Sequence, residues 1–294
     1  MHAAPQPVLV TRHAAAPKAL VARSHMPWPL PSHSVVVDTR RRGACVRQSV
    51  AGGLCVSPRT LLTARGRLAS WRNVRWFLGA LRLTGAETAV VVGNRQLRED
   101  FVAGMLYIAG QRRVEVVEGP LSAWLSHHPQ AAGAGTTRGV FREAIYTAWP
   151  RTRLVVLRPE LAARLRRGRG GPRLVDGRSY KRYERRGHIP TARSLPMADV
   201  TRDQGALRSL ISVRRPVVAY GAGPYESVAY FARLRMLGVP AQVFIGGWQD
   251  WAQARAMRTR RGPFGGLSAP DKALAAALAG AALVVFVWRM TRRR

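Results

Sequence analysis

Acidic residues are scarce in this sequence. Fifteen Asp and Glu residues stand against 48 Lys and Arg residues, so the formal net charge is +33, and only three of the basic residues are lysines. A positive charge of this size predicts nonspecific binding to polyanions at low salt. The arginines are scattered through every segment and form no single stripe, so we expect no specific nucleic-acid site. An arginine-driven nucleic-acid-binding module is kept as an alternative.

Cysteine is nearly absent as well. The two cysteines, Cys45 and Cys55, can form one disulfide but not a disulfide framework. No cluster of other ligands accompanies them, so we predict neither a metal site nor a cofactor. We interpret both as small buried hydrophobic residues. The alternative is a redox-active or persulfide-carrying pair, which needs surroundings that activate a thiol.

The most informative stretch runs from Pro216 to Trp251. Two short apolar runs, 216–220 and 241–245, flank a helical segment at 227–237 that ends at a glycine and a proline. Apolar runs without alternation are typical of parallel strands buried on both faces, so this stretch is predicted to be a βαβ unit. Its glycine-rich loop, 221–226, then lies between a strand and the amino end of a helix, where backbone N–H groups favour an anion.

This unit resembles the active-site unit of rhodanese domains, a family of sulfurtransferases. The resemblance rests on three motifs in the family's order, which are LVDGR at 174–178, GHIPTA at 187–192 and GGW…W at 246–251. It implies thiosulfate or mercaptopyruvate sulfurtransferase activity, which in the family depends on a cysteine that opens the loop. The position matching that cysteine here is Gly221.

The active-site-like loop therefore lacks the group that the family's chemistry needs. Sulfur transfer through a persulfide requires a thiolate nucleophile, and glycine has no side chain to carry sulfur. Glu226 stands where the family often places a basic or hydroxyl residue, and its carboxylate opposes anion binding. We predict no catalytic residue in this loop, which consists of Gly221, Ala222, Gly223, Pro224, Tyr225 and Glu226.

The first half of the chain repeats the order of the second. SVVVDTR at 34–40 repeats the Asp-x-Arg pattern, and helices predicted over 71–83 and 99–109 alternate with strands at 89–92 and 114–117. An internal duplication explains this order, and tandem rhodaneses have such an arrangement. Arg95 and Arg98 can hold an anion electrostatically, although exposed loop arginines are the plainer interpretation. Neither copy has the nucleophile, because the equivalent loop is Gly93, Asn94, Arg95, Gln96, Leu97 and Arg98.

Four residues of the second copy are predicted to be structural. Asp176, Arg178 and His188 can be read as a catalytic set, but the family mostly uses such residues to hold loops and the sheet edge together. A buried aspartate at a strand end normally satisfies backbone donors. Trp248 is interpreted as an anchor in the core.

A hydrophobic segment without charge occupies residues 273–288. As a helix it spans about 24 Å, slightly less than a hydrocarbon core of about 30 Å, and it has no polar face to expose beside a domain. We predict a single-pass membrane anchor with the body in the cytoplasm. The alternative is an alanine-rich helix packed on the second domain.

These observations predict an α/β fold. We expect two tandem rhodanese-like domains, each a parallel sheet with helices on both faces, and a C-terminal hydrophobic helix. The predicted order is a disordered basic tail (1–32), domain 1 (33–150), domain 2 (151–256), a linker (257–272), the membrane helix (273–288) and a basic tail (289–294). The predicted function is a catalytically inactive protein that binds a protein partner or a small anion at a membrane surface. The alternative is a sulfurtransferase that uses a non-standard cysteine or a partner's thiol.

Overall fold

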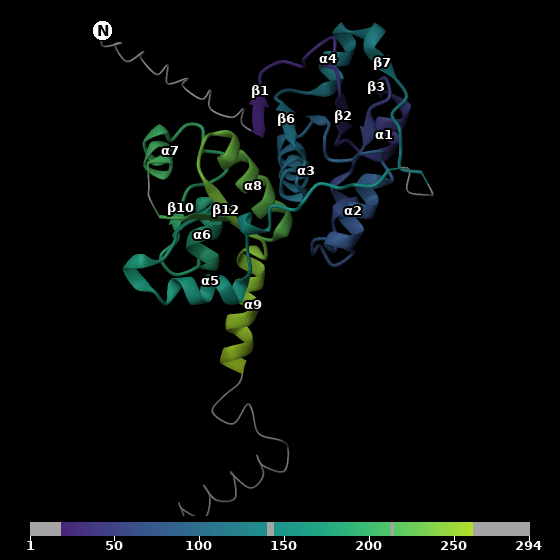
Figure 1. Cartoon of the computed structure of the whole chain (residues 1–294). Helices are drawn as coiled ribbons and strands as arrows, with labels where there is room; N and C mark the ends of the chain where they lie inside the picture. The colour runs from purple at the N-terminus through teal and green to yellow at the C-terminus, as the bar shows by residue number, and fades with distance from the viewer. Residues whose placement is uncertain (1–18, 140–143, 213–214, 261–294) are drawn as a thin grey trace, which may run out of the picture. The chain divides into compact units, whose positions relative to one another are not determined.

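The structure is a computed structural model that describes residues 19–139, 144–212 and 215–260 (Figure 1). The chain divides into two compact units, Met1–Trp248 and Gln249–Arg294. The predicted membrane segment 273–288 and the basic tail 289–294 lie outside the described residues. Within those described ranges, no helix combines the length and the apolar character that crossing a bilayer requires.

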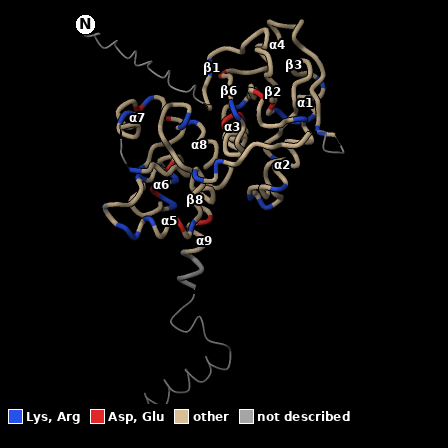
Figure 2. Tube along the Cα trace, in the orientation of Figure 1, with Lys and Arg blue, Asp and Glu red and all other residues tan. Residues whose placement is uncertain are grey.

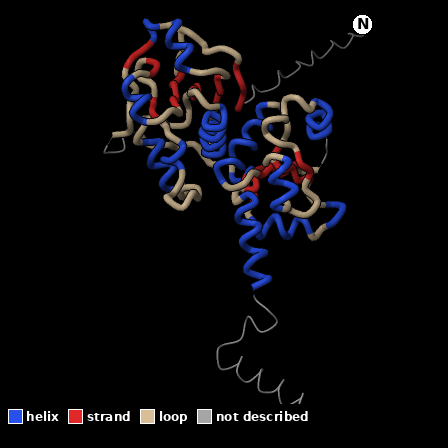
Figure 3. Tube along the Cα trace, turned by 180° about the vertical axis from the view of Figure 1, so that it is seen from behind, coloured by secondary structure: helices blue, strands red, loops and turns tan. Residues whose placement is uncertain are grey.

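The first unit contains two parallel sheets, whose strands are red in Figure 3. The first sheet has five strands in the order β1-β6-β5-β2-β4, and all of its pairings are parallel. The strands are β1 (Leu20–Arg23), β2 (Ser34–Asp38), β4 (Leu54–Cys55), β5 (Thr88–Val92) and β6 (Arg113–Val117). A short antiparallel pair, β3 (Ser49–Val50) and β7 (Ala132–Gly133), lies apart from it.

The second sheet has the same arrangement. Its five strands follow the order β10-β9-β11-β12-β8 and all of them pair in parallel. In each sheet the strand that carries the Asp-x-Arg motif is second from one edge. Counted from that edge, the order in the first sheet is β4-β2-β5-β6-β1, and the corresponding order in the second sheet is β10-β9-β11-β12-β8. The strands are β8 (Val155–Val156), β9 (Arg173–Asp176), β10 (Arg193–Ser194), β11 (Val217–Tyr220) and β12 (Ala241–Phe244). The predicted α/β class with parallel sheets is therefore confirmed.

Helices α1 to α8 lie between strands along the chain, and α9 follows strand β12. They are α1 (Arg42–Arg47), α2 (Trp71–Gly79), α3 (Gln96–Ala109), α4 (Leu121–His127), α5 (Arg158–Leu165), α6 (Tyr180–Arg186), α7 (Gln204–Ile211), α8 (Pro224–Met236) and α9 (Gly247–Arg260). Short 3-10 turns occupy Pro58–Leu61, Pro129–Ala131, Thr152–Leu154 and Gly168–Gly170.

The first sheet is covered on both faces. Successive side chains of a strand point to opposite faces, and here Val37 and Val91 lie in the main core cluster with residues of α2 and α3. Val36 and Val90 lie in a second cluster with Leu121 of α4. Burial on both faces explains why these strands read as continuous apolar runs without alternation.

Helices α3 and α8 pack directly against each other. Phe101 and Tyr225 have ring centroids 4.8 Å apart, and Tyr107 and Phe231 follow one to two turns later at 6.3 Å. The contacts run in the same direction along both helices, so α3 and α8 are parallel. Gly104 makes the close approach possible, because a Cβ at this position would meet Val228 Cγ1 at 2.7 Å.

Several predicted boundaries differ from the structure. Strand β1 pairs with β6, so residues 20–23 belong to a sheet and the prediction of a tail over 1–32 is wrong there. Helix α8 begins at Pro224, because proline suits the first turn of a helix, and α3 begins at Gln96. The last residues of both predicted loops are therefore helical. Helix α9 continues to Arg260, into the predicted linker.

Candidate functional site

The Asp-x-Arg motif of the second sheet is a buried ion pair. Asp176 ends β9, and its carboxylate accepts hydrogen bonds from Arg178 N at 3.0 Å and Arg178 Nη2 at 2.6 Å. Arg178 Nη2 also donates to Gly187 O at 2.7 Å, and its guanidinium lies 4.7 Å from the ring centroid of Trp248. Both charged side chains are almost fully buried. This arrangement joins the end of β9, the C-cap of α6 and the first turn of α9, and it leaves neither charge open to a substrate.

His188 takes no part in this pair. Its ring stacks on Tyr183 at 4.1 Å between centroids, and its Nδ1 lies 3.1 Å from Ile189 O. The structure thus brings Asp176, Arg178 and Trp248 together and places His188 in a separate aromatic contact.

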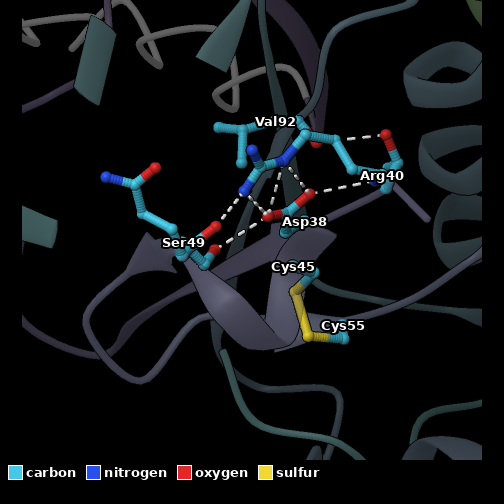
Figure 4. The surroundings of a disulfide bond; sticks show 8 residues. Asp38, Arg40, Cys45, Ser49, Cys55 and Val92 are labelled. Carbon is cyan, nitrogen blue, oxygen red and sulfur yellow. Dashed lines mark hydrogen bonds and ion pairs between the residues drawn. A yellow bond between two sulfur atoms is a disulfide. The ribbon is translucent and has the colours of Figure 1, made fainter. Parts of the chain in front are cut away.

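The first sheet repeats the ion pair (Figure 4). The Asp38 carboxylate accepts from Arg40 N at 2.9 Å and from Arg40 Nη2 at 2.7 Å. Ser49 Oγ donates to the same carboxylate at 2.8 Å, and Arg40 Nη2 also donates to Gln48 O. The pair joins the end of β2 to the turn that follows α1.

The loop that begins at Gly221 is filled by the chain itself. Gly221 N donates to Ser227 Oγ at 2.9 Å, and Ala222 N donates to the Glu226 carboxylate at 3.1 Å. A Cβ at Gly221 would meet Glu226 Cβ at 2.6 Å and Ser227 N at 2.9 Å. A Cβ atom this close to its neighbours would require the first turn of α8 to move. Position 221 therefore has neither a nucleophile nor the space for one.

The loop that begins at Gly93 is filled in a similar way. The Glu99 carboxylate accepts from Arg95 N at 2.9 Å, and a Cβ at Gly93 would overlap both this carboxylate and Thr39 Oγ1. Burial raises the pKa of Glu99 to about 7, although the Arg95 N–H opposes the change. In both loops a glutamate of the following helix therefore lies where an anion or a nucleophile could otherwise stand.

The other members of the first loop also contact the protein. Asn94 Oδ1 accepts from Ser122 N at 3.1 Å, and Gln96 Nε2 donates to the Asp100 carboxylate at 2.9 Å. Arg98 lies beside Tyr225, whose pKa burial raises to about 12 against the opposing effect of the Arg98 guanidinium. The two loops thus meet through Arg98 and Tyr225.

A buried ion pair between α3 and α8 was not predicted from the sequence. Arg233 donates to the two oxygens of Asp100 at 3.0 Å each and to Glu118 Oε1 at 2.7 Å. Asp100 is fully buried. The available signal was that Asp100 directly precedes the apolar run from Phe101 to Ala109 in α3, because a buried carboxylate normally requires a cationic partner.

The two cysteines form a disulfide between α1 and β4 (Figure 4). The interpretation of Cys45 and Cys55 as free hydrophobic residues is therefore wrong, although both are buried. Their Cα atoms are 5.8 Å apart, because β4 pairs with β2 and α1 follows β2 directly. The bond could not be read from the sequence, since a separation of ten residues is compatible with many geometries. Among residues 19–139, 144–212 and 215–260, no three His, Cys, Asp or Glu side chains form a group suited to a metal ion.

Comparison with known proteins places the fold. A family model described as "Rhodanese-like domain" matches residues 158–254. A probable thiosulfate sulfurtransferase superposes with a TM-score of 0.57 at 24% identity, covering 77% of this chain and 97% of that one. The 3-mercaptopyruvate sulfotransferase SseA from Escherichia coli gives 0.60 at 18% identity, covering 74% and 93%. Wild-type EanB gives 0.61 at 16% identity, covering 78% and 64%.

No curated protein matches the sequence. At identities below 25%, the structural matches show the fold alone. Residues 158–254 match a rhodanese-like domain, and the chain has a fold similar to that of solved sulfurtransferases.

Proposed function

We propose that this chain is a tandem pair of rhodanese-like domains that binds a small anion or a protein partner and does not transfer sulfur. The tandem arrangement is supported by the identical strand order of the two sheets. It is also supported by the Asp-x-Arg ion pairs at the ends of β2 and β9, which have the same bidentate contacts.

The proposal of inactivity rests on the Gly221 loop, which has no thiol and in which Ala222 N already has a hydrogen-bond acceptor. A persulfide mechanism needs a thiolate at the mouth of the sheet and N–H groups free to hold the anionic substrate. Gly221 supplies no thiol, and Ala222 N is already bonded to Glu226. Glu226 adds a negative charge, and among the described residues its ion-pair partner is the exposed Arg182, at 3.4 Å. Thiosulfate is therefore repelled from this loop.

A thiosulfate:cyanide sulfurtransferase assay on the full chain tests the proposal. We expect background rates for the wild type. We expect the same for Gly221→Cys, because Glu226 Cβ lies 2.6 Å from the position of the added Cβ. Turnover by the wild type that follows saturation kinetics would refute the proposal.

One observation favours a sulfurtransferase as the second candidate. Cys55 lines a cavity of about 290 Å³ together with Arg42, Ser57 and Arg138, and nearby guanidinium groups lower the pKa of a reduced thiol. After reduction, the Cys55 thiolate would attack the outer sulfur of thiosulfate and release sulfite, and cyanide would remove the sulfur as thiocyanate. This candidate requires activity that appears with a reductant and disappears in Cys55→Ala.

The membrane anchor at 273–288 remains part of the proposal. Its support is the uncharged sequence of that segment, followed by four arginines among residues 289–294. Fractionation of cells expressing the full chain or a chain without 273–294 tests it. We expect the full chain with the membranes and the shortened chain in the supernatant, and equal partitioning would refute the anchor.

A further inference from the structure

Four arginines line one cavity beside the two filled loops. The cavity has a volume of about 640 Å³, which lies within the range of small-molecule sites. None of the described residues that line it is acidic. Its walls are Arg41, Arg42, Ser57, Pro58, Arg59, Leu62, Arg98 and Tyr225.

The fold brings these residues together from separate parts of the chain. Arg41 and Arg42 stand at the start of α1, and Arg59 lies in the 3-10 turn that follows β4. The disulfide joins the same two segments, because Cys45 lies in α1 and Cys55 ends β4. Two walls of the cavity are therefore covalently linked.

The third wall depends on the packing of α3 against α8. Arg98 lies in the first turn of α3, and Tyr225 lies in the first turn of α8. The contact between Phe101, in the second turn of α3, and Tyr225, at 4.8 Å between ring centroids, holds the start of α8 beside the first two turns of α3. The phenol and the Arg98 guanidinium thus line the same side of the cavity.

These arginines differ from the other arginines near the two loops. Arg40, Arg178 and Arg233 are each held by a buried carboxylate. Across the part of the chain that the structure describes, none of the four cavity arginines forms an ion pair with a carboxylate. Basic residues are spread over the part of the chain that the structure describes (Figure 2). What distinguishes these four is that they line one surface cavity together.

We propose that this cavity binds the diphosphate group of a small molecule. Guanidinium groups donate paired hydrogen bonds to phosphate oxygens, and four of them around one space suit two linked phosphates better than a single monovalent anion. The ring of Tyr225 and the side chains of Leu62 and Pro58 provide an apolar surface for an organic group attached to the diphosphate. This proposal deepens the anion-binding part of the proposed function and rests on it.

Isothermal titration of the full chain at physiological salt tests the cavity. The probes are inorganic pyrophosphate and ADP, and inorganic phosphate serves as the comparison. We expect saturable binding of pyrophosphate that is tighter than that of phosphate. Tighter binding of ADP than of pyrophosphate assigns an organic diphosphate, and equal affinity assigns the inorganic ion.

The variants locate the binding. Each charge-assisted contact contributes about 1.5–3 kcal/mol, so Arg98→Gln and Arg59→Gln should each weaken pyrophosphate binding by about tenfold or more. Arg112→Gln is the matched control. It removes the same charge from an exposed position beyond the opposite end of α3, and it should change the affinity by less than about twofold. Circular dichroism confirms that each variant is folded.

Two results would overturn the proposal. One is the absence of pyrophosphate and ADP binding by the wild type. The other is an equal loss in Arg98→Gln and Arg112→Gln, which would assign binding to the general basic surface, as expected for nucleic acid. Either result leaves the assay for sulfur transfer unaffected. Conversely, sulfur transfer by the wild type would refute the proposed inactivity. It would not affect the proposal for the cavity, which only the titration tests.

Discussion

The buried carboxylate of Glu99 should make the protein less stable as the pH rises. Glu99 has only 2% of its surface exposed, and burial raises its pKa from 4.5 to about 7. Between these values the folded state holds a proton on Glu99 that the unfolded state has lost. The folded state therefore binds more protons, so the free energy of unfolding decreases with increasing pH. The contribution is fully present below about pH 4.5 and is lost by about pH 7.

The magnitude follows from the size of the pKa change. One pKa unit corresponds to 1.36 kcal/mol, so a change from 4.5 to about 7 corresponds to about 3 kcal/mol. Glu99→Gln removes this titration and keeps an oxygen that can accept from Arg95 N. We expect Glu99→Gln to match the wild type at pH 4.5 and to exceed its stability by up to about 3 kcal/mol at pH 8.

Urea unfolding of both proteins between pH 4.5 and pH 8 measures the difference. Glu87→Gln is the control of opposite sign, because hydrogen bonds from Thr84 and Gly85 keep the pKa of Glu87 low despite its burial. Glu87→Gln should be less stable than the wild type near neutral pH, and the difference should shrink in acid. Parallel pH profiles for Glu99→Gln and the wild type would show that Glu99 titrates normally and would refute the reasoning.

Two other substitutions test how the two sheets are held together, and a third tests the disulfide within the first half of the chain. Asp100→Ala leaves the buried Arg233 with Glu118 as a partner, so we expect a loss of about 3 kcal/mol in thermal or urea unfolding. Gly104→Leu places atoms where Val228 Cγ1 lies 2.7 Å from the added Cβ, and overpacking of this kind costs about 1–3 kcal/mol. Removal of the disulfide by Cys55→Ser should cost about 2–3 kcal/mol in urea unfolding. It should also weaken pyrophosphate binding, because it separates the segments of Arg42 and Arg59; unchanged affinity would show that the bond does not shape the cavity.

The sequence identified the strands because burial on both faces leaves a continuous apolar run. The runs at 89–92 and 216–220 were read correctly for this reason, and β5 and β11 are the central strands of their sheets. Strand β1 was missed because its pattern, LVAR, is only partly buried and stands at the edge of the sheet. Edge strands lack the two-sided burial that makes the pattern visible.

The contents of the loops were harder to predict. Glycine at 93 and 221 indicated a missing nucleophile, but not that a glutamate side chain would turn back and accept from the loop. Glu226 was predicted to oppose an anion, and in the structure it takes an anion's place on Ala222 N. Contacts between distant segments, such as Arg98 beside Tyr225 and Asp100 with Arg233, depend on how α3 packs on α8, which no local pattern specifies.

In both loops a glutamate of the following helix accepts a hydrogen bond from a loop N–H group, although the positions in the two loops differ. Glu226 lies five residues after Gly221 and accepts a hydrogen bond from Ala222 N. Glu99 lies six residues after Gly93 and accepts a hydrogen bond from Arg95 N. Both carboxylates stand in the first turn of a helix, where negative charge is favourable. Because each glutamate occupies one N–H donor of its own loop, an external anion has fewer donors to bind there. The four arginines of the arginine cavity form no ion pair with a described carboxylate, so an anionic ligand has more to gain there than in either loop.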